Sequence, residues 1–277
     1  MKRKLSFLFA SSLCFLGSVA PVKAEATLAN IQATGVLKLA IREDAAPFGY
    51  VDANQKLQGY CLDFFALLES QLIKELERNT ISLKLFKSTA NNRFSLVANN
   101  IVDLECGPNT INPNAPENIN FSNSFFLTGT QFLVREGNKL NLDRSLNNKI
   151  LGVIADTTTA EVIAERYPEA QLRQYQGVTA RNRGVQAVAQ GKVDAMISDG
   201  ILLRAEAQQQ ALSSTEYILV PDIPLTCDRY GMIIHSDDPQ WQDFVNSVID
   251  SPEAKNLSKA WFGNLFQYTQ VAQEFCQ

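Results

Sequence analysis

The chain of 277 residues contains a single histidine, His235, and no cysteine pair with CxxC spacing. Structural zinc sites draw four ligands mainly from cysteine and histidine, so no metal site is expected. Catalysis by Ser/His/Asp or Cys/His groups also needs a histidine, and His235 lies in a turn-like stretch beside two aspartates. GxSxG, P-loop and GxGxxG motifs are absent as well. The sequence therefore predicts no catalytic residue, no metal and no cofactor.

Basic residues and long apolar runs are scarce beyond the first 24 residues. Lys2, Arg3 and Lys4 precede an apolar run over residues 5–19, and Val22 and Ala24 supply small residues at the positions that a signal peptidase reads. Removal of residues 1–24 leaves 21 basic and 29 acidic residues, a net charge of −8. Without a basic stripe a nucleic-acid partner is excluded, and no later run reaches the length of a membrane span. We expect a signal peptide at 1–24 and a soluble protein in the periplasm or outside the cell.

Hydrophobic periodicity predicts alternating strands and helices from residue 36 onward. Strands are expected at 36–41, 81–86, 101–106, 125–127, 130–134, 150–155, 193–197 and 230–235. Helices are expected from Asp63, at 94–98, from Thr158, at 185–189, at 201–210, and after Asp238-Pro239 and Ser251-Pro252. A capping box of Thr158 and Glu161 is expected to begin one of them. This rhythm indicates an α/β fold built from two units rather than one continuous sheet.

Polar side chains follow several of these strands, where open α/β sheets place their ligand sites. They are Arg42, Arg93, Asn109, Thr110, Thr157, Thr158 and Asp199. An arginine suits a carboxylate because its planar fork donates two parallel hydrogen bonds. A helix start at the threonines suits an anion, and Asp199 could receive an ammonium group. Each of these residues also has a purely structural interpretation: the arginines could be solvated at the surface, and the threonines and Asp199 could cap helices. Phe48, after Pro47, could contact a ligand or pack in the core.

In their order along the chain these motifs resemble the extracellular solute-binding proteins of ABC transporters for polar amino acids, and among them the glutamate/aspartate-binding proteins. The matching stretches are GVLKLAIREDAAPFGYVDANQKLQGYCLDF, NNRFSLVANNIVDLECGPNT, FSNSFFLTGTQFLV, ILGVIADTTTAEV, GKVDAMISDG and RYGMIIHSDDPQW. The resemblance implies the type II periplasmic-binding-protein fold, with a ligand cleft between two lobes joined by two hinge segments. Lobe 1 would comprise residues 25–128 and 229–277, and lobe 2 residues 129–228. The hinges would lie around 128–131 and 227–230.

The resemblance also implies roles for single residues. Arg42 and Arg93 would bind the ligand's distal carboxylate, and Asp199 its ammonium group. Asn109, Thr110, Thr157 and Thr158 would contact the ligand, with Phe48 beside it. Arg181 stands where that subfamily has a polar ligand contact. Two positions depart from the pattern: Ala115 replaces an arginine that binds the α-carboxylate, and Asp156 replaces a glycine.

Four cysteines remain outside the signal peptide, and their even number in an exported protein favours disulfides with three possible pairings. The resemblance implies a Cys227–Cys276 bond, since receptor relatives join these positions. Cys61 and Cys106 could form a second bond or remain buried thiols.

The predicted function is therefore the monomeric solute-binding component of an ABC uptake system. It would capture a polar, acidic amino acid or a related small carboxylate and present it to a membrane permease. The alternatives are a ligand-sensing module and a dehydratase-like enzyme on the same scaffold.

Overall fold

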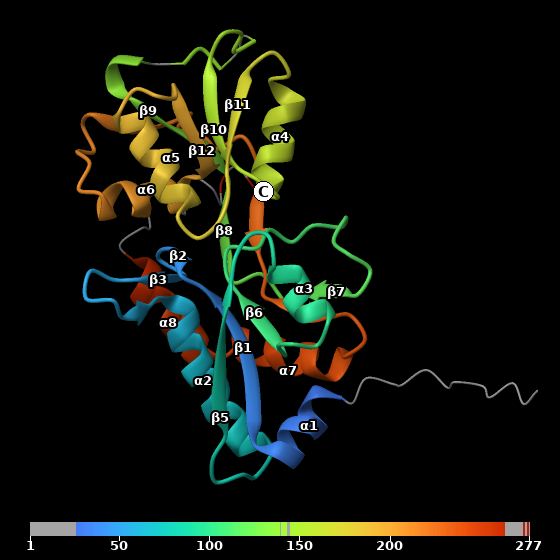
Figure 1. The fold of residues 1–277 in the computed structure, drawn as a ribbon. Helices are drawn as coiled ribbons and strands as arrows, with labels where there is room; N and C mark the ends of the chain where they lie inside the picture. The colour runs from blue at the N-terminus through green and yellow to red at the C-terminus, as the bar shows by residue number, and fades with distance from the viewer. Residues whose placement is uncertain (1–25, 139, 143–144, 264–273, 275, 277) are drawn as a thin grey trace, which may run out of the picture.

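The protein is described here by a computed structural model, which covers residues 26–138, 140–142, 145–263, 274 and 276. The predicted signal peptide and most of residues 264–277 lie outside this part. The described chain forms two α/β lobes, one above the other in Figure 1. The predicted two-lobed α/β fold is thereby confirmed.

The sheet of the first lobe has the strand order β5-β1-β6-β15-β7. Its strands are β1 (Val36–Arg42), β5 (Ser82–Ser88), β6 (Leu104–Cys106), β7 (Ile119–Phe121) and β15 (Ile233–His235). Strand β1 runs parallel to β5 and β6, whereas β15 is antiparallel to both β6 and β7. The carboxyl ends of β1, β5 and β6 consequently meet at one edge of the sheet.

The helices of this lobe are α1 (Thr27–Thr34), α2 (Tyr60–Glu75), α3 (Arg93–Ala98), α7 (Pro239–Ile249) and α8 (Pro252–Phe262). Leu37 and Leu39 of β1 pack into one core with α2, α7 and α8. Ala40 points to the opposite face and packs with Val97 of α3. This alternation is the period-2 burial that the sequence predicted for β1. The small strands β2 (Asp44–Ala45), β3 (Gly49–Val51) and β4 (Leu57–Gln58) follow β1.

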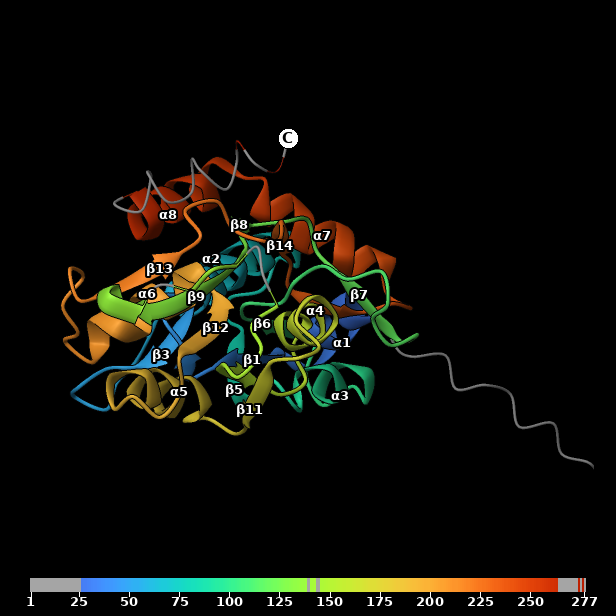
Figure 2. The same cartoon turned by 90° about the horizontal axis from the view of Figure 1, so that it is seen from above.

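The second lobe repeats this arrangement with the strand order β11-β10-β12-β9-β13. Its strands are β9 (Thr130–Arg135), β10 (Ile150–Ile154), β11 (Gln171–Tyr175), β12 (Ala195–Asp199) and β13 (Tyr217–Val220), and a 3₁₀ turn covers Glu136–Asn138. Strand β10 is parallel to β11 and β12, and β9 is antiparallel to β12 and β13. Helices α5 (Ala180–Ala189) and α6 (Gly200–Gln209) cover one face and α4 (Thr158–Arg166) the other, as Figure 2 shows from above.

Two antiparallel strands, β8 (Phe126–Thr128) and β14 (Asp228–Tyr230), connect the lobes. The predicted single strand at 230–235 is wrong, because the chain divides at Gly231 into β14 and β15, which belong to different sheets. Gly231 N–H donates to the Asn109 carbonyl, and Met232 N–H donates to Ser122 Oγ. Neither N–H group therefore continues the hydrogen-bond ladder of β14 or β15. Within the described residues no helix is both long and apolar enough to span a bilayer.

The structure corrects two further predictions, both of which concern the residue at which a helix begins. Helix α2 begins at Tyr60 rather than Asp63, because the loop carbonyls of Pro47 and Phe48 accept hydrogen bonds from the N–H groups of Tyr60 and Cys61. Helix α4 is capped by Thr157, whose hydroxyl accepts from Ala160 N–H at 3.2 Å, and not by a capping box that begins at Thr158.

Both predicted proline-initiated helices are present. Asp238 and Ser251 accept hydrogen bonds from the first turns of α7 and α8, and a proline follows each cap. These caps satisfy backbone N–H groups that would otherwise lack a partner, so they mark both helix starts from the sequence alone.

Candidate functional site

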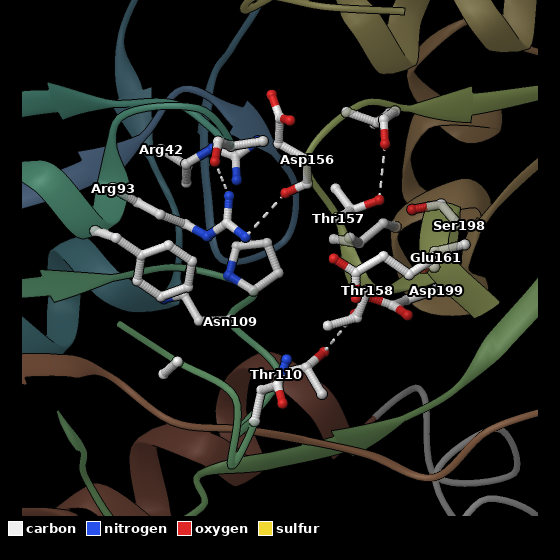
Figure 3. Close-up of a pocket in the computed structure, with 18 of the residues that line it drawn as sticks. Arg42, Arg93, Asn109, Thr110, Asp156, Thr157, Thr158, Glu161, Ser198 and Asp199 are labelled. Atoms are coloured by element: carbon white, nitrogen blue, oxygen red, sulfur yellow. Dashed lines mark hydrogen bonds between the residues drawn. The ribbon is translucent and has the colours of Figure 1, made fainter. Parts of the chain in front are cut away.

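A cavity of about 150 Å³ lies between the lobes, at the carboxyl ends of the parallel strands (Figure 3). Since a cavity of roughly 15 Å³ suffices for one water, this volume admits a small metabolite. All the predicted ligand-binding residues except Phe48 line it: Arg42, Arg93, Asn109, Thr110, Thr157, Thr158, Arg181 and Asp199. Ser198, at the end of β12, also lines the cavity and was not predicted.

Phe48 is the exception, because it lies outside this cavity. Its side chain is fully buried in the core of the first lobe, with ring centroids 5.1 Å from Phe126 and 5.3 Å from Tyr230. An aromatic ring buries a large apolar area, so a site surrounded by other rings is more favourable than a polar cavity wall.

Arg42, at the end of β1, is already paired. Its Nε and Nη2 donate to the two carboxylate oxygens of Asp44 at 2.8 and 2.9 Å, so the pair is bidentate. Burial acts to lower the pKa of Arg42, but the Asp44 carboxylate and its hydrogen bonds, together with Glu105 and Tyr230, raise it. Asp44 follows Arg42 by two residues, which places both side chains on one face of an extended chain. That spacing is the sequence signal that could have identified the pair.

The positive charges of Arg93 and Arg181 are less well compensated than the charge of Arg42. Burial and the nearby Arg42 charge lower the pKa of Arg93 to about 10 and also lower the pKa of Arg181. Arg93 donates to the carbonyls of Ala90 and Asp156, and Arg181 donates to the Asp44 carbonyl at 2.6 Å. Both guanidinium groups are thus held by backbone oxygens, which orient them without neutralising their charge. An anion in the cavity would therefore be stabilised by both.

Asp199, at the end of β12, contributes a buried carboxyl group to the cavity wall. Burial and the neighbouring Asp228 carboxylate raise the pKa of Asp199 to about 7. The Tyr230 hydroxyl donates to its Oδ2, and Oδ1 has no hydrogen-bond partner. A cation placed at Oδ1 would favour the ionised carboxylate, so this side of the cavity suits an ammonium group.

Unpartnered polar atoms are concentrated in this cavity. Among the described residues, five buried side-chain nitrogen or oxygen atoms lack a hydrogen-bond partner, and four belong to the cavity wall. They are Arg93 Nε, Arg181 Nε, Asn109 Oδ1 and Asp199 Oδ1. Each such atom costs free energy unless a partner reaches it. Two are donors and two are acceptors, so a molecule with both anionic and cationic groups would match them.

The two lobes also contact each other directly across the cavity. Asn91 Nδ2 donates to the Asp156 carboxylate, Arg93 donates to the Asp156 carbonyl at 3.2 Å, and Thr158 Oγ1 lies 3.5 Å from Thr110 Oγ1. Figure 3 shows residues of the first lobe facing residues of the second. The lobes are therefore closed on each other in this structure.

Both cysteine pairs are bonded. Cys61, in the first turn of α2, is joined to Cys106 at the end of β6, and Cys227 is joined to Cys276. The open alternative of free thiols at positions 61 and 106 is thus excluded. Within the described part of the chain, no group of three or more His, Cys, Asp or Glu side chains could hold a metal ion.

A two-lobed α/β protein with a closed, polar cavity between its lobes has the architecture of a small-molecule binding protein. The family profile of the Bacterial extracellular solute-binding proteins, family 3, matches residues 37–264, and the chain belongs to this family. The predicted recognition is confirmed.

Two curated relatives have related names. The glutamate/aspartate import solute-binding protein of Escherichia coli K12 is 28% identical over 265 residues, which cover 95% of this chain and 86% of that protein. The L-glutamate/L-aspartate-binding protein of Pseudomonas aeruginosa PAO1 is 25% identical, with coverages of 88% and 83%.

Solved structures support the fold. An ancestral amino acid-binding protein, a precursor of cyclohexadienyl dehydratase, gives a TM-score of 0.73 at 20% identity and covers 87% of this chain and 100% of its own. A solute receptor for L-cysteine of Neisseria gonorrhoeae gives 0.72 at 22% identity, with coverages of 88% and 95%.

Proposed function

We propose that the chain is the solute-binding component of an ABC importer and captures an acidic α-amino acid, such as glutamate or aspartate, or a related small carboxylate. The observation that carries the proposal is the set of four unpartnered atoms in the cavity wall, two donors on arginines and two acceptors. A dicarboxylic amino acid has carboxylates for the first two and an ammonium group for Asp199. The names of the Escherichia coli and Pseudomonas aeruginosa relatives support the same ligand class.

Arg93 and Arg181 are the proposed carboxylate ligands. Their lowered pKa values reflect positive charge that the protein itself does not compensate, which a bound carboxylate would correct. Arg42 is assigned a supporting role, because Asp44 already occupies its bidentate face. Arg181 supplies a buried positive charge in the cavity whose wall at position 115 is an alanine.

The first turn of α4 is the proposed site for the second carboxylate. Thr157 caps this helix through Ala160 N–H, and Thr158 and Thr110 present hydroxyls to the cavity. The free N–H groups and positive dipole end of a helix start favour an anion by roughly 0.3–1 kcal/mol. Asn109 is fixed by its amide, which donates to Glu105 at 2.6 Å, so that Oδ1 remains for a ligand donor.

Capture is proposed to proceed by hinge closure, with lobe 1 formed by residues 25–128 and 229–277 and lobe 2 by 129–228. Arg42, Arg93, Asn109 and Thr110 lie in the first of these and Thr157, Thr158, Arg181 and Asp199 in the second. A ligand meets both sets only when the lobes close, so its binding energy favours the closed form. The permease would recognise that form.

We further propose that the ligand is released unchanged. The cavity has carboxylates and arginines but no histidine or cysteine nucleophile along its wall. One structural relative is a precursor of a dehydratase, so turnover is a specific alternative to test. Recovery of chemically intact ligand after long incubation, followed by nuclear magnetic resonance, is the expected result.

Titration calorimetry tests the ligand class. L-Glutamate, L-aspartate, glutarate and L-lysine would be titrated into the wild type, Arg181→Ala and Arg183→Ala. Arg183 lies two residues further along α5 but is exposed, and it bonds to the Gln176 carbonyl outside the cavity. We expect glutamate or aspartate to bind, with at least about tenfold loss in Arg181→Ala and little change in Arg183→Ala. Binding of lysine but of neither acid would reject the proposal.

A further inference from the structure

Behind Asn109, outside the cavity wall, lies a buried carboxyl group. Glu105, in β6, is fully buried and does not line the cavity. Its Oε2 accepts from Asn109 Nδ2 at 2.6 Å. Its Oε1 accepts from the hydroxyl of Ser88, at the end of β5, also at 2.6 Å. One carboxylate thus joins β5 and β6 to the loop that forms part of the cavity wall.

Every polar group of Asn109 except Oδ1 has a partner. The backbone N–H donates to the Gly107 carbonyl at 2.9 Å, and the backbone carbonyl accepts from Gly231 N–H at 3.0 Å. The side-chain nitrogen donates to Glu105 at 2.6 Å and to the Gly107 carbonyl at 3.3 Å. Oδ1 is buried and unpartnered. Asn109 therefore offers a ligand one atom, and that atom is an acceptor.

The orientation of this side-chain amide depends on Glu105. An ionised carboxylate has only acceptors, so the NH₂ group and not Oδ1 must face it. Burial raises the pKa of Glu105, but its two hydrogen bonds and the charges of Arg42 and Arg93 act in the opposite direction and favour the ionised form. The loop packs closely against this contact, since a Cβ on Gly107 would be 3.0 Å from Glu105 Oε1. Without Glu105, only the longer bond to the Gly107 carbonyl would favour the same orientation.

We propose that Glu105 is a specificity-determining positioning residue: it holds Asn109 Oδ1 toward the ligand's ammonium group, so that the site prefers amino acids to dicarboxylates without nitrogen. The inference rests on the proposed function and deepens it. In an ionised acidic amino acid the ammonium group has the only hydrogen-bond donors, so Oδ1 can accept from no other part of the ligand. Asn109 supplies this acceptor from the first lobe and Asp199 supplies another from the second. The ammonium group is thus bound from both lobes.

A purely structural role for Glu105 has a different consequence. A residue that only anchors the loop affects every ligand alike, because all ligands meet the same displaced loop. A residue that orients the Asn109 amide changes the preference between ligands that have an ammonium group and ligands that lack one. The ratio of two affinities therefore separates the two roles, whatever happens to stability.

Titration calorimetry with L-glutamate and glutarate, by displacement for the weaker ligand, measures this ratio. Both ligands have two carboxylates, but glutarate has no ammonium group. We expect Glu105→Ala to lower the ratio of glutamate affinity to glutarate affinity by about five- to tenfold, because the Asn109 amide can then turn. Glu105→Gln keeps the shape and can turn either its oxygen or its NH₂ group to Asn109, so the ratio should fall by about two- to threefold. Where Glu105→Ala does not fold, the result with Glu105→Gln decides.

Asp103→Ala is the matched control. Asp103 directly precedes β6, accepts from Lys38 N–H at 2.7 Å and does not line the cavity. Its loss should lower the free energy of unfolding and leave the affinity ratio unchanged. A double-mutant cycle then tests the route through Asn109: in an Asn109→Ala background, Glu105→Ala should lower the ratio no further.

Two results would overturn the inference and leave the proposed function intact. One is an unchanged ratio in both Glu105→Ala and Glu105→Gln. The other is the same fall in ratio with and without Asn109, which would mean that Glu105 acts by another route. Failure of every acidic amino acid to bind the wild type would overturn the proposed function and the inference together.

Discussion

Asp156 adopts a left-handed backbone conformation, with φ of 58°, at the point where β10 leads into α4. Aspartate tolerates this conformation better than most residues, though less well than glycine. Its side chain is exposed, and it accepts a hydrogen bond from Asn91 of the opposite lobe. Its negative charge also acts on Arg93, which we assign to ligand binding. One residue therefore links the lobes and competes with an anionic ligand.

Asp156→Asn separates these two effects. Asparagine also tolerates the left-handed conformation, and its side-chain oxygen can still accept from Asn91, but the charge is gone. We expect about two- to fivefold tighter binding of L-glutamate, with the gain shrinking at high salt, because an exposed charge acts weakly and is screened. Titration calorimetry at low and high ionic strength measures this. Weaker binding in the variant would mean that the charge helps closure more than it opposes the ligand.

At the level of helices and strands, the Cys61–Cys106 disulfide joins two elements of the first lobe. It links the first turn of α2 to the end of β6, just before the loop that contains Asn109 and Thr110. Both cysteines are fully buried in the core of the first lobe. The bond therefore fixes two elements that contribute to the cavity or to its support.

The double variant Cys61→Ala/Cys106→Ala tests the contribution of this bond. The cysteines are 45 residues apart, and closing a loop of that length constrains the unfolded chain by about 4 kcal/mol. We expect the free energy of unfolding in urea to fall by about 2–4 kcal/mol, with a larger m-value because the unfolded chain exposes more surface. An unchanged free energy of unfolding would show that the unfolded chain is already constrained at this point.

At the scale of the whole molecule, the two connections between lobes pass very close to each other. Gly129 lies between β8 and β9, and a Cβ placed there would be 2.0 Å from the Thr226 carbonyl oxygen and 2.6 Å from Pro224 Cβ. The Gly129 carbonyl accepts from Gly200 N–H, and Thr130 N–H donates to Thr226 Oγ1. The closed arrangement therefore depends on a residue without a side chain at this crossing.

Gly129→Ala should force the connecting segments apart. We expect a loss of roughly 1–3 kcal/mol in stability, weaker ligand binding, and a smaller decrease in radius of gyration on addition of L-glutamate. Small-angle X-ray scattering and calorimetry measure these effects. Gly137→Ala is the matched control, because nothing lies within 4 Å of the added Cβ. Identical scattering and affinity in both variants would contradict a hinge at Gly129.

Hydrophobic patterns and the order of motifs predicted the architecture and most of the cavity wall. Period-2 and helical hydrophobic patterns depend on neighbours a few residues apart, so they predicted strands such as β1 and β10 and helices such as α7 with boundaries close to those observed. The carboxyl ends of parallel strands meet at one edge of a sheet, so the polar residues that follow these strands were expected to lie together. The order of the motifs along the chain indicated the same polar residues. Arg93 and Asp199 were therefore predicted on both grounds, and Arg181 by the resemblance alone.

Which of these residues are available to a ligand depends on contacts between distant parts of the chain. Arg42 was predicted to bind a carboxylate and is paired with Asp44, Phe48 was predicted to contact ligand and lies in the core, and the strand at 230–235 divides between two sheets. Asp228 gave no local signal, because its carboxylate raises the pKa of Asp199, which is 29 residues earlier in the chain. Burial and charge compensation are sums over contacts that are distant in sequence, and a linear pattern does not contain them.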